Sequence, residues 1–372
     1  MRWNLKKRTT NLALKKPGGF IENIKVCLLI FSIFLRSALG ADVNQMSPSP
    51  IHVLMNANSS PSLVNSVDFH PEANQFCVTF THNHSVVIYQ LDEDDRVSIF
   101  QVLQNASSKL SCPQHALFSK DGRSLLVVNW CNQTFNVYHA DLNGVYQEAP
   151  IAVIPFHLPT DSFRPHGMAL SPDGNYLAVA YGASKQDPRA VALYQVNDLG
   201  TAQVGFKLLS LLQGNEVEEG IPKGIAFSPD GSCLLVTFSN TNSVAIFKID
   251  LSNKKIIPTP RQILNGTSSH ISRPEDIKFN AEGNYCAVSN SDEDTITFYL
   301  FDRENNYFVN DSPSRIIKNP EAHLCFPHGL AFSSDGKYLS VTQFGPVIFD
   351  ENDNLFSWGN KRDDSVVIFK LK

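Results

Sequence analysis

The 372-residue chain lacks the short motifs that mark several common classes of enzyme. It has no Gly-x-Ser-x-Gly elbow, no His-Glu-x-x-His pair, no phosphate-binding loop and no dinucleotide fingerprint. Serine hydrolases of that type, zincin proteases, nucleotide-binding enzymes and Rossmann enzymes are therefore left without support. The seven cysteines include no Cys-x-x-Cys pair, so zinc ribbons and thioredoxin-like chemistry are unsupported as well.

The chain also lacks an excess of positive charge. Its formal net charge is −5, and eight of its 31 basic residues but only one of its 36 acidic residues lie in residues 1–40. Without that segment the net charge is −12. Because proteins that bind nucleic acid usually carry a basic face, we expect no nucleic-acid partner.

No apolar run is long enough for a comfortable membrane span. The longest run at the N-terminus, residues 26–35, follows a basic segment and precedes the small residues of 38–40. Such an order predicts a signal peptide over residues 1–40, with export to the periplasm or the exterior and no membrane span after cleavage. An uncleaved signal anchor is the alternative, since Arg36 and the long basic lead are atypical.

Export would permit disulfides. Cys112 and Cys131 fall near the same end of two adjacent predicted strands, where a bridge is geometrically conceivable. Cys77, Cys233 and Cys286 lie within predicted strands and are more typical of apolar core residues.

What the sequence does have is a pattern that returns six times, and its best copy is residues 164–179. The aligned apolar positions are separated by 49 to 57 residues, and they are Phe69, Phe118, Leu170, Phe227, Phe279 and Phe332. Repeats of about this length are typical of β-propeller blades. The sequence therefore predicts one propeller domain over residues 41–372, with repeats starting near 66, 114, 166, 223, 275 and 328.

Within each repeat the hydrophobic period is two, which indicates strands, and helical periodicity is absent. Repeat four shows strands over 223–228, 233–238, 243–250 and 256–264, with a Ser-Pro-Asp-Gly turn after the first. The prediction is an all-β, six-bladed propeller of four-stranded antiparallel blades. The last repeat supplies only three strands, so we expect residues 51–56 to complete that blade.

The register Pro-His-Gly-x-Ala-x-Ser-Pro-Asp-Gly-x-Tyr-Leu-x-Val in residues 165–179 resembles the repeats of bacterial YVTN-type and lactonase-like β-propellers. The resemblance covers residues 69–371. Relatives with this pattern include sugar-lactone hydrolases, so the resemblance implies a propeller fold and allows a lactonase activity. The seven-bladed lactonases have seven repeats, whereas this chain shows six.

In a propeller the first strand of each blade lines the axis, so the residues that enter it meet at one mouth of the channel. All six residues that follow the repeated Pro or its equivalent are polar, and they are Asn65, Gln114, His166, Lys223, Glu275 and His328. The next position adds His115 and Asp276, and the preceding one adds Arg164 and Arg273. A ring of polar and titratable groups at a concave site predicts ligand binding.

The candidate catalytic residues are those that could move a proton or stabilise an anion: His166, His328, Glu275, Arg164 and Arg273. The candidate ligand-binding residues are Asn65, Gln114, His115, Lys223 and Asp276. We expect no cofactor and no metal. A long insertion between the last strands, residues 343–364, mixes aromatic and acidic residues and is a candidate lid or partner-binding patch.

Two functions remain open. The first is an exported binding or scaffold module that uses the channel mouth for a small-molecule or protein ligand, and the sequence is compatible with a monomer. The second is a lactonase-like hydrolase in which His166 or His328 activates water. In that hydrolase Arg164 or Arg273 would stabilise the developing oxyanion. A metal-dependent variant ranks third, with Glu275 among its candidate ligands.

Overall fold

The computed structural model describes residues 49–55, 62–156, 158–160, 162–182, 184, 187–213, 220–318, 322–349, 355–358 and 364–371. All of them belong to one compact unit, residues 43–372. The predicted signal peptide, residues 1–40, lies outside the described residues. Within the described part, we find no helix that is both long enough and apolar enough to span a membrane.

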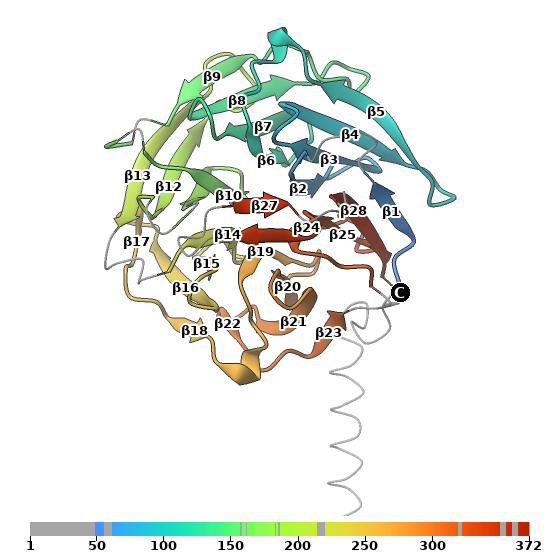
Figure 1. The fold of residues 1–372 in the computed structure, drawn as a ribbon. Coiled ribbons are helices and arrows are strands. Elements are labelled where there is room, and N and C mark those ends of the chain that lie inside the picture. The colour runs from blue at the N-terminus through green and yellow to red at the C-terminus, as the bar shows by residue number, and fades with distance from the viewer. Residues whose placement is uncertain are drawn as a thin grey trace, which may run out of the picture. The chain divides into compact units, whose positions relative to one another are not determined.

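Six antiparallel sheets form the blades of a β-propeller, as predicted (Figure 1). Blades one to three each contain four consecutive strands. The strands of blade one are β2 (Val64–Phe69), β3 (Gln75–Phe80), β4 (Ser85–Leu91) and β5 (Val97–Leu103). Blade two contains β6 (Pro113–Phe118), β7 (Ser124–Asn129), β8 (Thr134–His139) and β9 (Ala152–Pro155). Blade three contains β10 (Pro165–Leu170), β11 (Tyr176–Tyr181), β12 (Ala190–Asn197) and β13 (Gly205–Gln213).

Blades four and five have an outer strand that is split in two. The strands of blade four are β14 (Pro222–Phe227), β15 (Cys233–Phe238) and β16 (Ser243–Asp250), with β17 (Lys255–Ile256) and β18 (Gln262–Leu264) both paired to β16. Those of blade five are β19 (Pro274–Phe279), β20 (Tyr285–Asn290) and β21 (Thr295–Asp302), with β22 (Tyr307–Phe308) and β23 (Arg315–Lys318) both paired to β21.

Blade six closes the ring with a strand from the other end of the sequence. It contains β24 (Pro327–Phe332), β25 (Tyr338–Gln343) and β28 (Ser365–Lys370), and its outer strand is β1 (His52–Met55). β1 pairs antiparallel with β28, and Ile51 N donates to Ile368 O at 2.8 Å. The predicted closure by residues 51–56 is confirmed.

Short Ser-x-Asp-Gly turns connect the first two strands of four blades. In blade three the Ser171 hydroxyl donates to Asp173 Oδ1 at 2.5 Å and accepts from Tyr176 N at 2.9 Å. Gly174 takes a φ of +78°, which L side chains disfavour. The same Ser to Asp bond recurs at Ser119, Ser228 and Ser333, so one local device sets the hairpin in each of these repeats.

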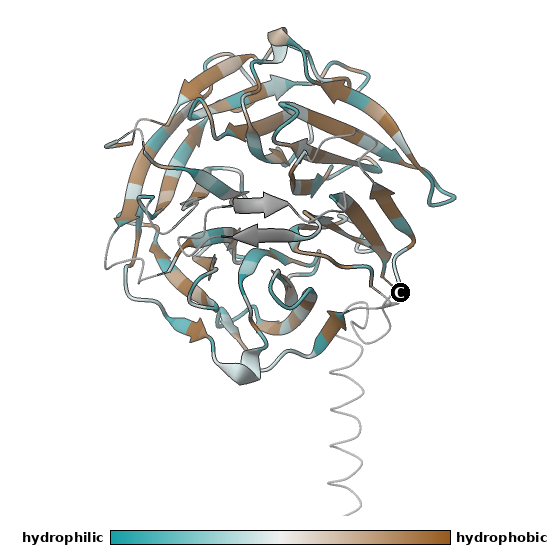
Figure 2. Ribbon diagram, viewed as in Figure 1, coloured by the Kyte–Doolittle hydropathy of each residue, from teal (hydrophilic) through white to brown (hydrophobic). Residues whose placement is uncertain are grey.

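Apolar side chains concentrate along the strands, and polar ones concentrate in the connecting loops (Figure 2). Successive blades pack face to face, with Phe135, Tyr181 and Tyr194 among the largest buried side chains between blades two and three. Cys112 and Cys131 form the bridge that their positions suggested. Cys77, Cys233 and Cys286 are buried, unpaired thiols.

The insertion in blade six contains a hairpin of its own. β26 (Val347–Phe349) pairs antiparallel with β27 (Leu355–Trp358). In the view of Figure 1, β27 crosses the centre of the ring of blades. Its role as a lid or partner-binding patch stays a prediction.

Candidate functional site at the channel mouth

The six inner strands form a closed ring around the axis, in the order β2, β6, β10, β14, β19, β24 and back to β2. Each begins with a Pro or Val, and the polar residue that follows it is buried in all six blades. The ring of polar residues predicted from the sequence therefore exists, and it divides into two halves. Blades one and two contribute the amides of Asn65 and Gln114, while blades three to six contribute His166, Lys223, Glu275 and His328.

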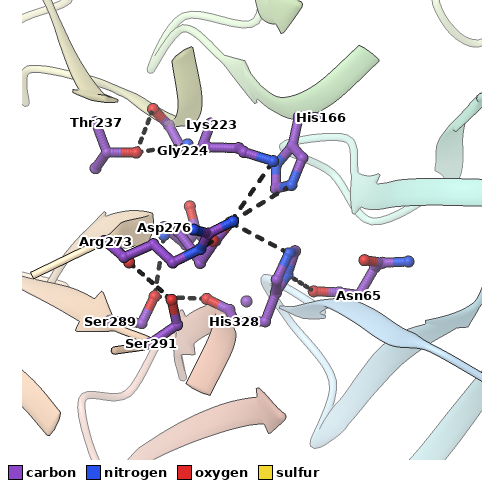
Figure 3. A network of polar contacts seen from close by, with 12 residues as sticks. Asn65, His166, Lys223, Gly224, Thr237, Arg273, Asp276, Ser289, Ser291 and His328 are labelled. Carbon is purple, nitrogen blue, oxygen red and sulfur yellow. Dashed lines mark hydrogen bonds and ion pairs between the residues drawn. The ribbon is translucent and has the colours of Figure 1, made fainter. Parts of the chain in front are cut away.

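Glu275 is the centre of the charged half. Its Oε2 lies 3.6 Å from His166 Nε2, 3.5 Å from His328 Nε2 and 4.0 Å from Lys223 Nζ. Its Oε1 lies 3.4 Å from Arg273 Nε. Figure 3 shows the His166, Lys223, Arg273 and His328 side chains converging from different blades. Five of the predicted site residues thus meet at one point.

Hydrogen-bond acceptors face one another at this point. His328 Nδ1 lies 2.8 Å from the carbonyl oxygen of Asn65, and because a carbonyl only accepts, Nδ1 carries the proton (Figure 3). The Nε2 of a neutral His328 then presents a lone pair toward Glu275. Glu275 Oε2 is itself buried and accepts no hydrogen bond from the described residues. The two acceptors are 3.5 Å apart, which leaves no room for an atom between them, but a water that lies to one side of both could donate one hydrogen bond to each.

Burial sets the protonation of both imidazoles. It lowers the pKa of His328, and the negative charge of Glu275 opposes this shift. Burial also holds the pKa of His166 well below its ordinary value, with the charge of Lys223 acting in the same direction. Both rings are therefore neutral at pH 7 and available as proton acceptors.

Two aromatic side chains support the charged half from the loop side. The ring of Phe344 stacks on His328 with centroids 4.3 Å apart, and Phe326 stacks on Phe344 at 5.5 Å. The guanidinium of Arg273 lies 6.0 Å from the centroid of Phe326. Sequence reasoning missed Phe326 and included Phe344 only as part of the candidate lid, residues 343–364. The available signal was their position, one beside the Pro of β24 and one directly after β25.

The two amide side chains of the ring hydrogen-bond to each other. Gln114 Nε2 donates to Asn65 Oδ1 at 3.1 Å, and Asn65 Nδ2 donates to the hydroxyl of Thr81. Gln114 Oε1 is buried without a hydrogen-bond partner among the described residues. Neither amide pairs with Glu275 in that part of the chain. This half can offer a hydrogen bond to a ligand but carries no charge.

Three predicted site residues lie apart from Glu275. Arg164, which precedes β10, joins none of the ion pairs found among the described residues. The carboxylate of Asp276 instead accepts from Leu330 N at 2.9 Å and from Lys278 Nζ at 3.1 Å. His115 lines a different cavity, toward the far ends of the inner strands.

The cluster has donor atoms that suit a metal. One atom from each of His166, Glu275 and His328 lies within 4.8 Å of the others. However, Lys223 and Arg273 both contact the Glu275 carboxylate, and their positive charges oppose a divalent cation at the same point. The two cations beside Glu275 therefore make this point unfavourable for a divalent metal ion.

Comparisons with known proteins agree with this fold. A family model described as lactonase, 7-bladed beta-propeller, matches residues 56–272 and 224–324. The chain belongs to this lactonase family. It differs from the family's description in having six blades. The lactonase part of the resemblance noted in the sequence is thus confirmed, while the YVTN-type label stays a resemblance of the repeats.

Individual members are distant. A 6-phosphogluconolactonase from Formosa agariphila is 27% identical over 161 residues, which is 43% of this chain and 42% of that enzyme. The matched region therefore spans about two fifths of the length of that relative.

Two solved structures share the fold. The periplasmic gluconolactonase of Pseudomonas aeruginosa has a TM-score of 0.54 at 17% identity, covering 84% of this chain and 89% of that one. A protein from Lactobacillus plantarum has a TM-score of 0.56 at 16% identity, covering 86% and 90%. At these identities the similarity establishes the fold alone.

Proposed function

We propose that this propeller is a lactone hydrolase whose reaction centre is the cluster of His166, Glu275 and His328. Membership of the lactonase family favours this function over the binding or scaffold module. The single observation that carries the proposal is the convergence of two buried imidazoles, beside two cations, on a carboxylate oxygen that accepts no hydrogen bond from the described residues. This is a set of groups that can hold and deprotonate a water next to an electrophile.

The proposed reaction begins with a water that donates to Glu275 Oε2 and His328 Nε2. His328 takes one proton as the water oxygen bonds to the lactone carbonyl carbon. The carbonyl oxygen becomes an oxyanion, which Arg273 and Lys223 stabilise by charge. The ring C–O bond then breaks, the ring oxygen leaves as an alkoxide, and a protonated imidazole returns the proton to it. The product is the open hydroxy acid.

The charges also suggest the substrate class. Lys223 and Arg273 place two positively charged groups beside the Glu275 carboxylate. A lactone that carries a phosphate or carboxylate would bind there better than an uncharged one. The name of the Formosa agariphila relative, a 6-phosphogluconolactonase, is consistent with a phosphorylated sugar lactone.

The test is hydrolysis of 6-phosphogluconolactone and of unphosphorylated gluconolactone by the purified full chain, followed by pH-stat and corrected for spontaneous opening. We expect turnover that prefers the phosphorylated lactone. His328→Gln should lower kcat by about 10²- to 10⁴-fold, the usual contribution of a general base. His323→Gln, at an exposed imidazole, is the matched control and should keep full activity.

Three outcomes would count against the proposal. Absence of turnover on every lactone by folded protein would return the binding module to first place. Full activity in His328→Gln and in His166→Gln would exclude the assigned centre. Loss of activity on treatment with EDTA, with recovery on adding zinc, would favour a metal centre at His166, Glu275 and His328, a different ligand set from the one predicted from the sequence.

A further inference from the structure

The channel has a second cavity, at the end opposite to the polar ring. It has a volume of about 260 Å³ and is lined by the later residues of five inner strands, β2, β6, β10, β14 and β19. None of the six residues of the polar ring lines it. Because a strand rises about 3.3 Å per residue, positions such as Asp68 and Lys278 lie roughly 10 Å along the axis from that ring. The cavity is therefore separate from the proposed reaction centre.

The walls of this cavity are mostly apolar, with a few polar groups on one side. Leu117, Phe118, Leu170 and Phe227 supply aliphatic and aromatic surface. The polar lining groups are Asp68, His115 and Lys278. An apolar cavity with a few polar groups on one side is the usual form of a site for a small molecule. Its volume is slightly below the usual lower limit of about 300 Å³, so the occupant must be small.

Among the described residues at and beside this cavity, two carboxylates, Asp68 and Asp276, share one cation, Lys278. Lys278 Nζ lies 3.1 Å from Asp276 Oδ1, so these two charges neutralise each other. Asp68 Oδ2 accepts a hydrogen bond from Phe118 N at 2.9 Å. In the described part of the chain no side chain donates a hydrogen bond to the Asp68 carboxylate and no cation lies within 4.0 Å of it, although the charge of Lys278 lowers its pKa against the effect of burial. Burial lowers the pKa of His115 well below its ordinary value, so His115 is neutral and does not compensate Asp68.

We propose that this cavity binds a small primary ammonium compound with an apolar body, with the ammonium group on Asp68. An ammonium group would supply the missing positive charge, and its apolar body would cover the walls formed by Leu117 and Leu170. The aromatic rings of Phe118 and Phe227 can add attraction to a cation that lies near their faces. Burial raises the pKa of Asp68 to about 7, so the ionised carboxylate is unfavourable where it stands, and a bound cation would stabilise it.

The Asp68 carboxylate has a structural role as well, and the test must separate the two roles. Its hydrogen bond from Phe118 N joins blade one to blade two. Asp68→Asn keeps one acceptor oxygen for that bond and removes the charge, while its second oxygen becomes an NH2 donor. The probe is benzylammonium, with benzyl alcohol as its uncharged analogue of similar shape and phenylacetate as an anion. Binding to the full chain is measured by calorimetry.

We expect benzylammonium to bind the native chain at least tenfold more tightly than benzyl alcohol. Asp68→Asn should abolish that preference, whereas Asp94→Asn, at an exposed aspartate, should leave it unchanged. Affinity should also rise with pH, by about tenfold between pH 6 and pH 8, as Asp68 ionises near pH 7. The charged or titratable groups near Asp68 are Lys278 and Asp276 on β19, Cys77 on β3, His115 on β6, and Tyr146.

Several results would overturn the proposal. One is equal affinity of the native chain for benzylammonium and benzyl alcohol. Another is equal binding of benzylammonium by the native chain and by Asp68→Asn. A third is tighter binding of phenylacetate than of benzylammonium, which would assign the site to Lys278. If Asp68→Asn does not fold, the pH series on the native chain decides, because an affinity that does not change between pH 6 and pH 8 excludes Asp68. Lactone turnover is measured in a separate assay. A negative result for ammonium binding therefore does not decide the lactonase proposal, and a negative result for turnover does not decide the ammonium site.

Discussion

Removal of the negative charge of Glu275 should destabilise the whole propeller as well as stop its chemistry. The Glu275 side chain is only 2% exposed, and its two oxygens lie 3.4 Å from Arg273 Nε and 4.0 Å from Lys223 Nζ. At an effective dielectric constant of 20, one unit pair at 4.0 Å attracts by about 4 kcal/mol before the cost of desolvation is subtracted. Loss of one partner of a buried ion pair typically costs about 3–5 kcal/mol, because the remaining charge stays buried without compensation. We expect Glu275→Gln to lower the free energy of unfolding by this amount.

The assay is urea unfolding at pH 7, followed by circular dichroism, with lactone turnover measured on the same preparations. A double-variant cycle separates charge from packing. In Glu275→Gln combined with Lys223→Met, one uncompensated cation is gone, so the double variant should lose less stability than the sum of the two single variants. Glu304→Gln, at an exposed glutamate, is the control and should change stability by less than about 0.5 kcal/mol.

The reasoning would be refuted by a Glu275→Gln variant within about 1 kcal/mol of the native chain, together with additive effects in the double variant. That pair of results would mean that the carboxylate does not neutralise Lys223 in the folded protein. If stability falls as expected but turnover is unchanged, Glu275 acts only in folding, and the proposed water site at its Oε2 is wrong.

The remaining predictions concern pH, packing and the disulfide. Burial lowers the pKa of His166 in the folded protein, so on acidification the unfolded chain binds this proton first and stability should fall below about pH 6.5. His166→Gln should lessen the loss of stability between pH 7 and pH 5, as measured by urea unfolding. A Cβ on Gly224 would lie 2.4 Å from Asp276 Cα, so Gly224→Ala should cost at least about 1–3 kcal/mol in the same assay. Cys112→Ser with Cys131→Ser opens a loop whose ends are 19 residues apart, which should cost about 3 kcal/mol and lower the midpoint of thermal unfolding.

The fold could be predicted from the sequence because its determinants are local and repeated. Each Ser-x-Asp-Gly turn contains its own hydrogen bonds, such as that from Ser171 to Asp173, and these do not depend on distant contacts. The closing strand was predictable for a different reason. Blade six lacked a strand at the C-terminal end, and residues 51–56 were the apolar segment left without a partner.

The candidate site was only partly predictable. The repeat pattern indicated which residues enter the channel, because position within a strand fixes the layer along the axis. It did not indicate that His166, Lys223 and His328 would all contact Glu275, or that Asn65 would hydrogen-bond to Gln114 rather than to a charged residue of the ring. Those pairings depend on side-chain length and rotamer across the axis, which no local pattern encodes.

Neighbouring positions on one strand were harder to assign. Asp276 directly follows Glu275, yet its carboxylate is held by Leu330 N and Lys278 rather than by the polar ring. Adjacent residues of a strand point in different directions, and the register of β19 against β20 shifts between Pro274 and Asp276. The second cavity was not predicted at all, because Asp68 and Lys278 come from β2 and β19 and acquire a shared environment only when the ring closes.

The number of blades bears directly on the chemistry. In a six-bladed ring β10 and β24 lie on opposite sides of the axis, and the His166 and His328 rings meet across it with centroids 4.9 Å apart. The radius of a ring of evenly spaced strands grows with their number, by about 15% from six strands to seven. The same two imidazoles would then stand farther apart, and neither would face the other directly across the axis. The three-way contact at Glu275 is therefore a property of the six-bladed ring, and the activity of this chain has to be tested on its own residues rather than transferred from seven-bladed relatives.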